Sequence, residues 1–304
     1  MKKRLLYLTF GLLLTAAVLL SSTSGFSRTD RQHYETAIAM DSESFPGYHL
    51  KDYTVRYFDG DVDYVLKDGV LSKEKPVFRS LVATIEEVNG ELQVVVPTAE
   101  RMKDTLSLLG MGQEGLETSI DHDALQVATL WHEGFHCYQL SHFEGAINRE
   151  SLPEDLETFI AQEIDAKEEL ISAFLEAENM LERAINAKEL HQAKEFAAEF
   201  LSIYHKRREN LTEEARQMES LYEMMEGSAQ YIESKIYRAQ AGEEAYVEYY
   251  MPRESEYLYG ISKYYQLGRK ICLVLDKLEP DWSTDFDFSM SLSEVLEESI
   301  KEER

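Results

Sequence analysis

The sequence is poor in cysteine, proline and glycine, and each shortage argues against a class of structure. Its 304 residues include only two cysteines, Cys137 and Cys272, which are too few for a disulfide scaffold but allow one bridge in an oxidising compartment. Six prolines and 15 glycines are low counts for this length, and they argue against a turn-rich all-β architecture. We therefore expect long helices.

Basic residues are also scarce relative to acidic ones. The chain has 31 Lys and Arg against 57 Asp and Glu, which gives a formal net charge of −26. Such a chain has no basic stripe that could displace counterions from phosphates, so we expect no nucleic-acid partner. Hydrophobic residues make up 44 % of the chain, which is enough to bury a core and argues against disorder.

The N-terminus has the layout of a secretory signal. Lys2, Lys3 and Arg4 precede an apolar run over residues 5–20, and small residues follow this run. The run is short for a membrane span and no clean cleavage site follows it, so residues 1–25 are predicted to be a signal peptide or a signal anchor. Both alternatives place the mature chain outside the cytoplasm, secreted or at the cell surface. Contact with a membrane is expected only through this segment, if it is uncleaved.

Residues 30–304 are predicted to form a single α+β domain in which helices dominate. A small N-terminal sheet is expected over about residues 45–100, where Asn89-Gly90 is a strong hairpin signal because both residues tolerate positive φ. A helical part covers about 121–282 and includes a long helical insertion at about 153–217, where apolar residues recur at helical spacing. The sheet region contains four predicted strands, at residues 53–58, 63–66, 81–85 and 92–96.

The motif His-Glu-x-x-His lies at residues 132–136, in the expected helical part. His132 and His136 are four residues apart, so on a helix both imidazoles project from one face and can bind a single Zn²⁺. Glu133 lies beside them, where its carboxylate can take a proton from zinc-bound water without being a ligand. Apolar residues at spacings of three and four surround the motif, as an amphipathic helix requires: Leu125, Ala128, Trp131, Phe135 and Tyr138.

A catalytic zinc needs a third protein ligand, and the sequence offers two candidates. Glu226 lies in a segment whose helix would present Gln230 and Glu233 on the same side. His142 reproduces the outer spacing of a longer motif, His-Glu-x-x-His-x-x-Gly-x-x-His, but Gln139 stands where that motif needs glycine for the chain to leave the helix. We favour Glu226 and keep His142 as the alternative.

Two segments together resemble the gluzincin group of zinc metallopeptidases, in which a downstream helix supplies a glutamate ligand. They are His132-Glu133-Gly134-Phe135-His136 and Glu226-Gly227-Ser228-Ala229, and they look most like poorly characterised bacterial secreted members with a Glu-Gly-x-Ala pattern. The resemblance implies a zincin-like fold, zinc ligated by His132, His136 and Glu226, and Glu133 as general base. The small Gly227 and Ala229 would let the Glu226 helix approach the motif helix closely.

The residue that supports the first histidine differs from the family pattern. In the thermolysin pattern an Asp four residues after the ligand Glu accepts a hydrogen bond from that histidine, and here Gln230 holds this place. An amide oxygen can also accept the bond, although it raises the basicity of the ligand less than a carboxylate does. Glu233, Asp121 or Asp123 could serve instead.

A peptidase also needs a group that stabilises the oxyanion of the transition state. In similar enzymes a phenol or a histidine near the zinc often does this, and residues 256–268 are rich in tyrosine. Our candidates are Tyr231, Tyr259 and Tyr264, in that order. Any one of them could instead be a half-buried packing residue.

These patterns predict a zinc metallopeptidase, a hydrolase that cleaves peptide or protein substrates outside the cytoplasm. The alternative is a non-catalytic extracellular helical binding protein with a structural or vestigial zinc site. Three protein ligands with an open fourth position would favour the hydrolase. A four-ligand site closed by His142 or Cys137 would favour the binding protein.

Overall fold

The computed structural model describes residues 25–40, 44–77, 82–108, 121–143, 152–251 and 257–301. The chain divides into two compact units, which we call unit 1 (residues 1–141 and 232–251) and unit 2 (residues 142–231 and 252–304). A small N-terminal sheet and many long helices confirm the predicted α+β, helix-dominated fold. Residues 1–24 of the predicted targeting segment lie outside the described residues. Among the residues that the structure describes, no helix is long and apolar enough to cross a membrane.

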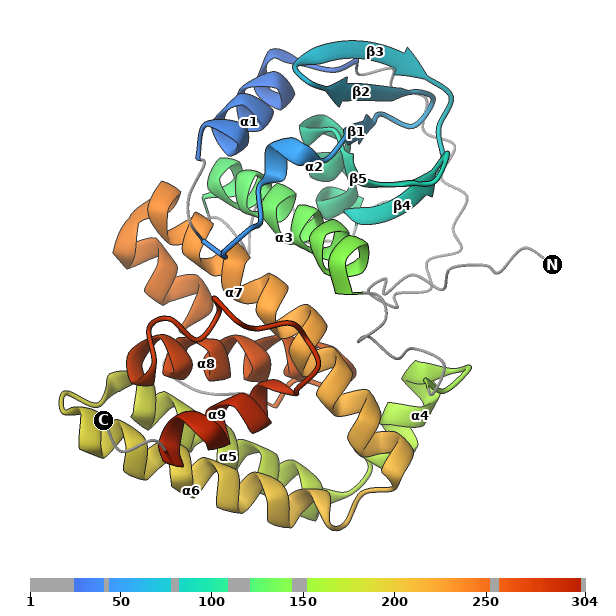
Figure 1. Ribbon diagram of the computed structural model, residues 1–304. Helices are drawn as coiled ribbons and strands as arrows, with labels where there is room; N and C mark the ends of the chain where they lie inside the picture. Colours follow the sequence, from blue (N-terminus) through green and yellow to red (C-terminus); the bar gives the residue numbers. More distant parts are fainter. Residues whose placement is uncertain are drawn as a thin grey trace. The chain divides into compact units, whose positions relative to one another are not determined.

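Unit 1 contains a five-stranded sheet in the order β3-β2-β1-β5-β4 (Figure 1). The pair β1 and β5 is parallel, and the other neighbours are antiparallel. Asn89 and Gly90 adopt positive φ, 54° and 84°, in the predicted hairpin turn. The strands are β1 (Val55–Phe58), β2 (Asp63–Lys67), β3 (Val70–Glu74), β4 (Thr84–Val88) and β5 (Glu91–Pro97).

Two strand expectations need correction. The sequence pattern did not predict β3, whose residues are all exposed and therefore show no alternation of apolar and polar side chains. The strand expected at 81–85 is found at Thr84–Val88, where it pairs with the strand after the hairpin turn; residue 81 lies outside the described residues.

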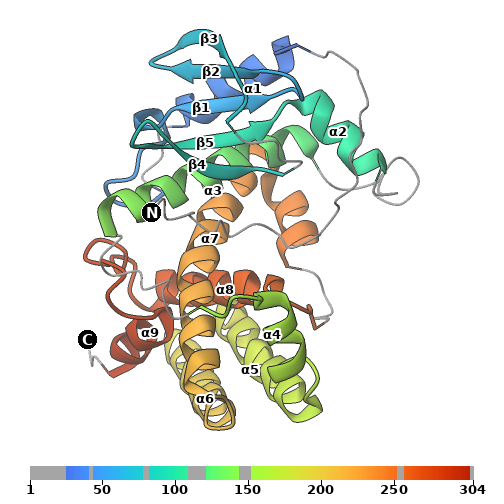
Figure 2. The same cartoon turned by 90° about the vertical axis from the view of Figure 1, so that its right-hand side faces the viewer.

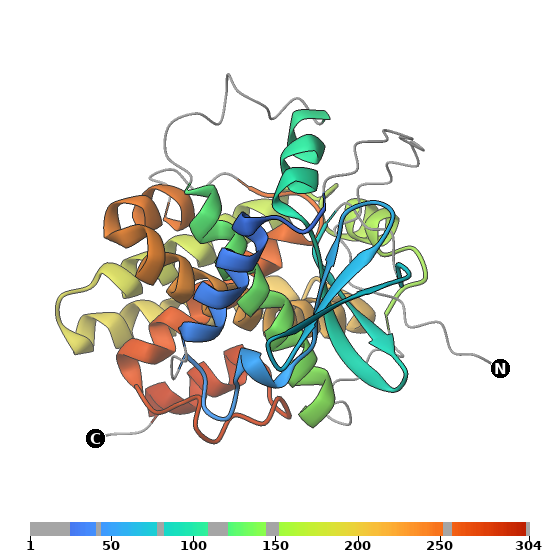
Figure 3. The same cartoon turned by 90° about the horizontal axis from the view of Figure 1, so that it is seen from above.

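Besides the sheet, unit 1 contains the helices α1 (Arg28–Ala39), α2 (Ala99–Leu108) and α3 (His122–Phe143). The sequence analysis did not predict α1, which begins with a capping box between Ser27 and Asp30. Seen from above, this helix lies across α3 (Figure 3), and the Trp131 indole donates to the Ala37 carbonyl at 3.1 Å. Asp121 immediately precedes α3, and its carboxylate accepts a hydrogen bond from the backbone N–H of Ala124.

The motif helix α3 is held by an aromatic cluster. The Tyr48 ring, from the segment before β1, lies edge to face with Trp131 and with Phe135 of α3, at 5.2 Å in both cases. Gly134 lies where this segment approaches the helix most closely, since an added Cβ would be 2.5 Å from both the Tyr48 hydroxyl and Leu50 Cδ1. The glycine inside the motif therefore serves packing.

Unit 2 is helical, and its helices α4 to α6 occupy most of the predicted insertion at 153–217 (Figure 2). Its helices are α4 (Leu156–Glu163), α5 (Glu168–Asn186), α6 (Leu190–Arg208), the first part of α7 (Glu213–Tyr250), α8 (Ser262–Leu278) and α9 (Leu292–Lys301). α5 and α6 pack side by side, and α8 contacts both of them. Residues of α7 up to Tyr231 belong to unit 2, and those from Ile232 onward belong to unit 1.

The crossing of α7 and α8 depends on two glycines. A Cβ on Gly227 would lie 2.4 Å from Gly268 Cα, and one on Gly268 would lie 2.1 Å from the Glu223 carbonyl oxygen. The atoms nearest to Gly227 belong to α8, so this glycine allows α7 and α8 to cross closely. The approach to the motif helix that we expected from Gly227 and Ala229 stays a prediction. The backbones of α7 and α8 touch at this point.

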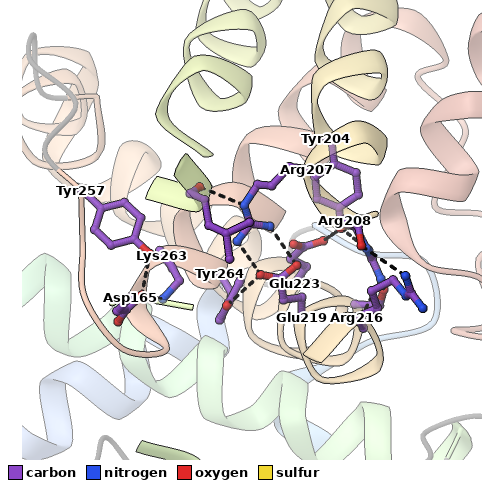
Figure 4. A network of polar contacts seen from close by, with 12 residues as sticks. Asp165, Tyr204, Arg207, Arg208, Arg216, Glu219, Glu223, Tyr257, Lys263 and Tyr264 are labelled. Carbon is purple, nitrogen blue, oxygen red and sulfur yellow. Dashed lines mark hydrogen bonds and ion pairs between the residues drawn. The ribbon is translucent and has the colours of Figure 1, made fainter. Parts of the chain in front are cut away.

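A network of buried charged and phenolic side chains joins helices of unit 2 (Figure 4). Arg207 of α6 binds both carboxylate oxygens of Glu219 on α7, at 2.8 and 3.0 Å, and both side chains are almost fully buried. The Tyr204 hydroxyl donates to Glu223 at 2.6 Å, and the Tyr264 hydroxyl of α8 donates to Glu219 at 3.0 Å. Cys137 and Cys272 are both buried thiols and are not joined in a disulfide bond.

Candidate metal centre

His132 and His136 lie on one face of α3, one turn apart, as their spacing predicts. Their side chains are buried, with residue exposures of 7 % and 6 %. The two Nε2 atoms are 3.1 Å apart. Because Zn–N bonds are about 2.0–2.1 Å long, two nitrogens at this separation can bind one ion.

The other nitrogen of each ring lies close to a side-chain oxygen. His132 Nδ1 lies 2.7 Å from Glu233 Oε2, and His136 Nδ1 lies 2.7 Å from Gln139 Oε1. An oxygen acceptor in these places favours the tautomer with the proton on Nδ1, which leaves the lone pair on Nε2. Two lone pairs then face each other across 3.1 Å, an arrangement that repels unless a cation is shared between them.

Glu226 of α7 offers a third candidate ligand atom. One atom each from His132, His136 and Glu226 lie within 4.8 Å of one another, and the Glu226 residue is 1 % exposed. Among the described residues these three form a buried group that could hold a metal ion. Two imidazoles and a carboxylate are ligands that zinc accepts.

His142, the alternative ligand, does not belong to this group. α3 continues through Gln139 to Phe143, so the chain makes no sharp exit after the motif. His142 therefore lies in the last turn of the helix, where it is exposed. Its position agrees with the argument that a glycine would be needed to return it towards the metal.

Glu133, the predicted general base, is partly exposed on α3 between the two histidines. Its negative charge acts on its neighbours. Burial raises the pKa of Cys137 and of Tyr48 well above their ordinary values, and the Glu133 charge raises both further.

Among the predicted supporting residues, Glu233 contacts a histidine ligand. Gln230 is part-buried, and its carbonyl oxygen has no hydrogen-bond partner among the described residues. Asp121 caps the start of α3, and Asp123 lies 2.9 Å from His33. Both aspartates are therefore engaged near the beginning of the helix.

The three candidate tyrosines have different surroundings. The Tyr231 hydroxyl donates to Asp276 at 2.7 Å, and the Tyr264 hydroxyl donates to Glu219 at 3.0 Å. Each of these hydroxyls already gives its single proton to a carboxylate. Tyr259 is 69 % exposed. Their role as oxyanion donors remains a prediction.

Sequence reasoning missed two residues near the histidines. Gln139 was considered only as a residue that lets the helix continue, yet it is three positions after His136 on the same helix, and that spacing could have identified it. Tyr250 donates to Glu233 Oε1 at 2.5 Å from seventeen residues further along the chain. No helical spacing indicates that contact.

Comparison of the chain with known proteins identifies no relative. No family model matches the sequence, no curated protein matches it, and no solved structure matches the fold. The resemblance to gluzincins therefore remains a prediction from the two sequence segments.

Proposed function

We propose that the protein is a zinc metallopeptidase of the gluzincin type that cleaves peptide or protein substrates outside the cytoplasm. The observation that carries the proposal is the geometry of the two histidines. Their Nε2 atoms face each other at 3.1 Å, while each Nδ1 lies against an oxygen acceptor. The location outside the cytoplasm rests on the sequence of residues 1–25 alone.

The number of ligands favours a catalytic over a structural zinc. Catalytic sites use three protein ligands and leave a position for water or substrate, whereas structural sites are closed by four. The candidate group among the described residues has three members, and neither Cys137 nor His142 is one of them. This supports the hydrolase over the non-catalytic binding protein.

In the proposed mechanism, the metal and the residues around it have separate roles. Zinc, when bound, supplies Lewis acidity towards a water molecule and the carbonyl of the scissile bond. Glu133 accepts the proton of the attacking water on its carboxylate and returns it to the nitrogen of the leaving amine. Glu233 and Gln139 hold the two imidazoles in the tautomer that binds metal.

The first experiment measures the zinc content of the protein after loading and removal of unbound metal. We expect one zinc per chain in the wild type, and its loss in His136→Ala and Glu226→Ala. His142→Ala and His122→Ala replace exposed histidines at the two ends of α3 and should keep it. Absence of zinc from the loaded wild type would contradict the proposal.

The second experiment asks whether the bound zinc is catalytic. Glu133→Gln keeps the size of the side chain but removes the base, so it should retain the zinc and lose cleavage of a mixed peptide library by about a hundredfold or more. Full cleavage by Glu133→Gln would contradict the role of Glu133. No cleavage by the zinc-loaded wild type would favour the non-catalytic binding protein.

A further inference from the structure

We propose that Tyr250 is a positioning residue of the metal centre. Its hydroxyl fixes the Glu233 carboxylate, which in turn holds the His132 imidazole with Nε2 directed at the metal. The inference rests on the proposed zinc site, and it adds to that site a residue that is neither a ligand nor a contact of one. All three side chains belong to unit 1.

A reversal of the chain at Gly242 brings Tyr250 to Glu233. In a continuous helix seventeen residues span about 25 Å, so Tyr250 could not touch Glu233. The helix α7 is interrupted at Gly242, where φ is 87° and ψ is 173°. That conformation is essentially restricted to glycine. The residues after Gly242 therefore return along the preceding part of α7.

The returning segment is held by side-chain contacts on both sides of the turn. Arg238 pairs with Glu243 and lies over the ring of Tyr246 at 5.2 Å. The Tyr250 ring contacts Tyr237 at 5.5 Å, edge to face. The Tyr237 hydroxyl accepts the backbone N–H of Asp121 at the start of α3. Packing thus fixes the ring of Tyr250, which is 5 % exposed.

The two oxygens of Glu233 have different partners. Oε1 accepts the Tyr250 hydroxyl at 2.5 Å, and Oε2 lies 2.7 Å from His132 Nδ1. A hydrogen bond from a phenol restricts the rotation of the carboxylate. Without it, the carboxylate could turn away from Nδ1, and the imidazole would lose the partner that sets its tautomer and orientation.

Tyr249 offers a matched control on the same turn of the helix. Its ring also contacts Tyr237, at 5.4 Å, and it is 38 % exposed. The hydroxyl that donates to Glu233 is that of Tyr250. Tyrosine-to-phenylalanine substitution removes one phenolic oxygen at either position. At position 250 it breaks the proposed chain of contacts, and at position 249 it leaves that chain intact.

The experiment measures the affinity of the full-length apoprotein for Zn²⁺ by competition with a chromophoric chelator. Outer-sphere partners of ligands contribute about 10- to 100-fold to metal affinity, and Tyr250 acts one contact further out, so Tyr250→Phe should weaken binding about three- to tenfold. Tyr249→Phe should bind as the wild type does. In a Glu233→Ala background, Tyr250→Phe should cause no further loss.

A spectroscopic measurement separates positioning from a general loss of structure. In the Co²⁺-substituted protein, the exchangeable Nδ1 protons of ligand histidines give shifted proton resonances in the nuclear magnetic resonance spectrum. Tyr250→Phe should move the His132 resonance and leave the His136 resonance in place, because His136 is held by Gln139. Gly242→Ala, which strains the turn that delivers Tyr250, should act in the same direction.

Wild-type affinity and an unmoved His132 resonance in Tyr250→Phe would overturn the inference while leaving the zinc site intact. An equal loss of affinity in the Glu233→Ala background would also overturn it, since the effect would then not pass through Glu233. If the wild type binds neither Zn²⁺ nor Co²⁺, both the proposed function and the inference about Tyr250 are contradicted. The His136→Ala variant distinguishes these cases, because it must lose the metal whether or not Tyr250 matters.

Discussion

Gly134 shows that a single residue inside the motif is determined by its neighbours. An alanine there would place Cβ 2.5 Å from the Tyr48 hydroxyl and from Leu50 Cδ1. Alanine is the better helix former by up to about 1 kcal/mol, whereas overpacking a core costs about 1–3 kcal/mol. The two effects oppose each other, and the close contact with buried Tyr48 decides the outcome.

We therefore expect Gly134→Ala to lower the free energy of unfolding by about 1–2 kcal/mol, because the packing cost exceeds the gain in helix propensity. Urea unfolding followed by circular dichroism measures this. An increase in stability would show that Tyr48 moves aside without cost.

The residues of the metal centre also show where sequence spacing is sufficient and where it is not. His132, His136 and Glu133 follow from one helical turn, and Gln139 could have followed from the next. Tyr250 could not, because its contact depends on the backbone conformation of Gly242, and no periodicity encodes that reversal. Glu226 lies in a helix, as predicted. Its closeness to His132 and His136 depends on how separate helices pack, which the spacing of residues in the sequence does not encode.

At the scale of elements, α6 and α7 are joined by a buried ion pair. Arg207 and Glu219 are 1 % and 0 % exposed at their side chains, and Glu219 also accepts the Tyr264 hydroxyl of α8. The nearby Arg208 donates to the Ser220 hydroxyl on α7 at 2.8 Å. Removing one partner of such a pair leaves a charge buried without compensation.

Arg207→Met should therefore destabilise the protein by about 3–5 kcal/mol, measured by chemical denaturation. A double variant, Arg207→Met with Glu219→Met, should recover much of that loss because no buried charge remains. Lys67→Met breaks the exposed pair with Glu91 and should change little. An equally small effect of Arg207→Met would mean that water reaches Glu219.

Glu223 belongs to the same network and makes the stability depend on pH. Burial is the main cause that raises the pKa of its carboxyl from 4.5 to about 7, and the charge of Glu219 adds to this, while Arg208 and Arg207 oppose it. Between these two values the folded state holds more protons than the unfolded state. The contribution of Glu223 to stability therefore falls as the pH rises from about 4.5 to about 7.

Glu223→Gln should remove this component. The difference in free energy of unfolding between variant and wild type should shift in favour of the variant as the pH rises through that range, because the wild type alone must ionise a buried group. Urea unfolding at several pH values measures this difference, in which titration of the histidines cancels. A difference that does not change with pH would place the carboxyl pKa near its ordinary value.

The elements that sequence reasoning missed share a physical cause. Helix α1 buries polar side chains, Asp30 and His33, so its inner face is not marked by apolar spacing. Strand β3 lies at an edge of the sheet with every residue exposed. In contrast α3 was predictable, because apolar residues recur at helical spacing around the motif.

For the whole molecule, a metal bound only by the folded state adds to stability. At a free zinc concentration one hundred times the Kd the gain is about 2.7 kcal/mol. We expect a chelator to lower the melting temperature of the zinc-loaded wild type, and restored zinc to raise it again. His136→Ala should melt at one temperature with and without the chelator. If the chelator leaves the melting temperature of the zinc-loaded wild type unchanged, metal binding is not coupled to folding.

The reversal at Gly242 also bears on how the centre could change during evolution. Tyr250 and Glu233 are fixed to each other by a contact, and not by the length of chain between them. Insertions or deletions in the returning segment could therefore be tolerated wherever a tyrosine still ends opposite the carboxylate. In homologous chains we expect the histidines and glutamates to align without gaps, while the tyrosine drifts in position relative to them. The tyrosine equivalent to Tyr250 would be recognised in a structure by its contact with the carboxylate, and not in an alignment by its position.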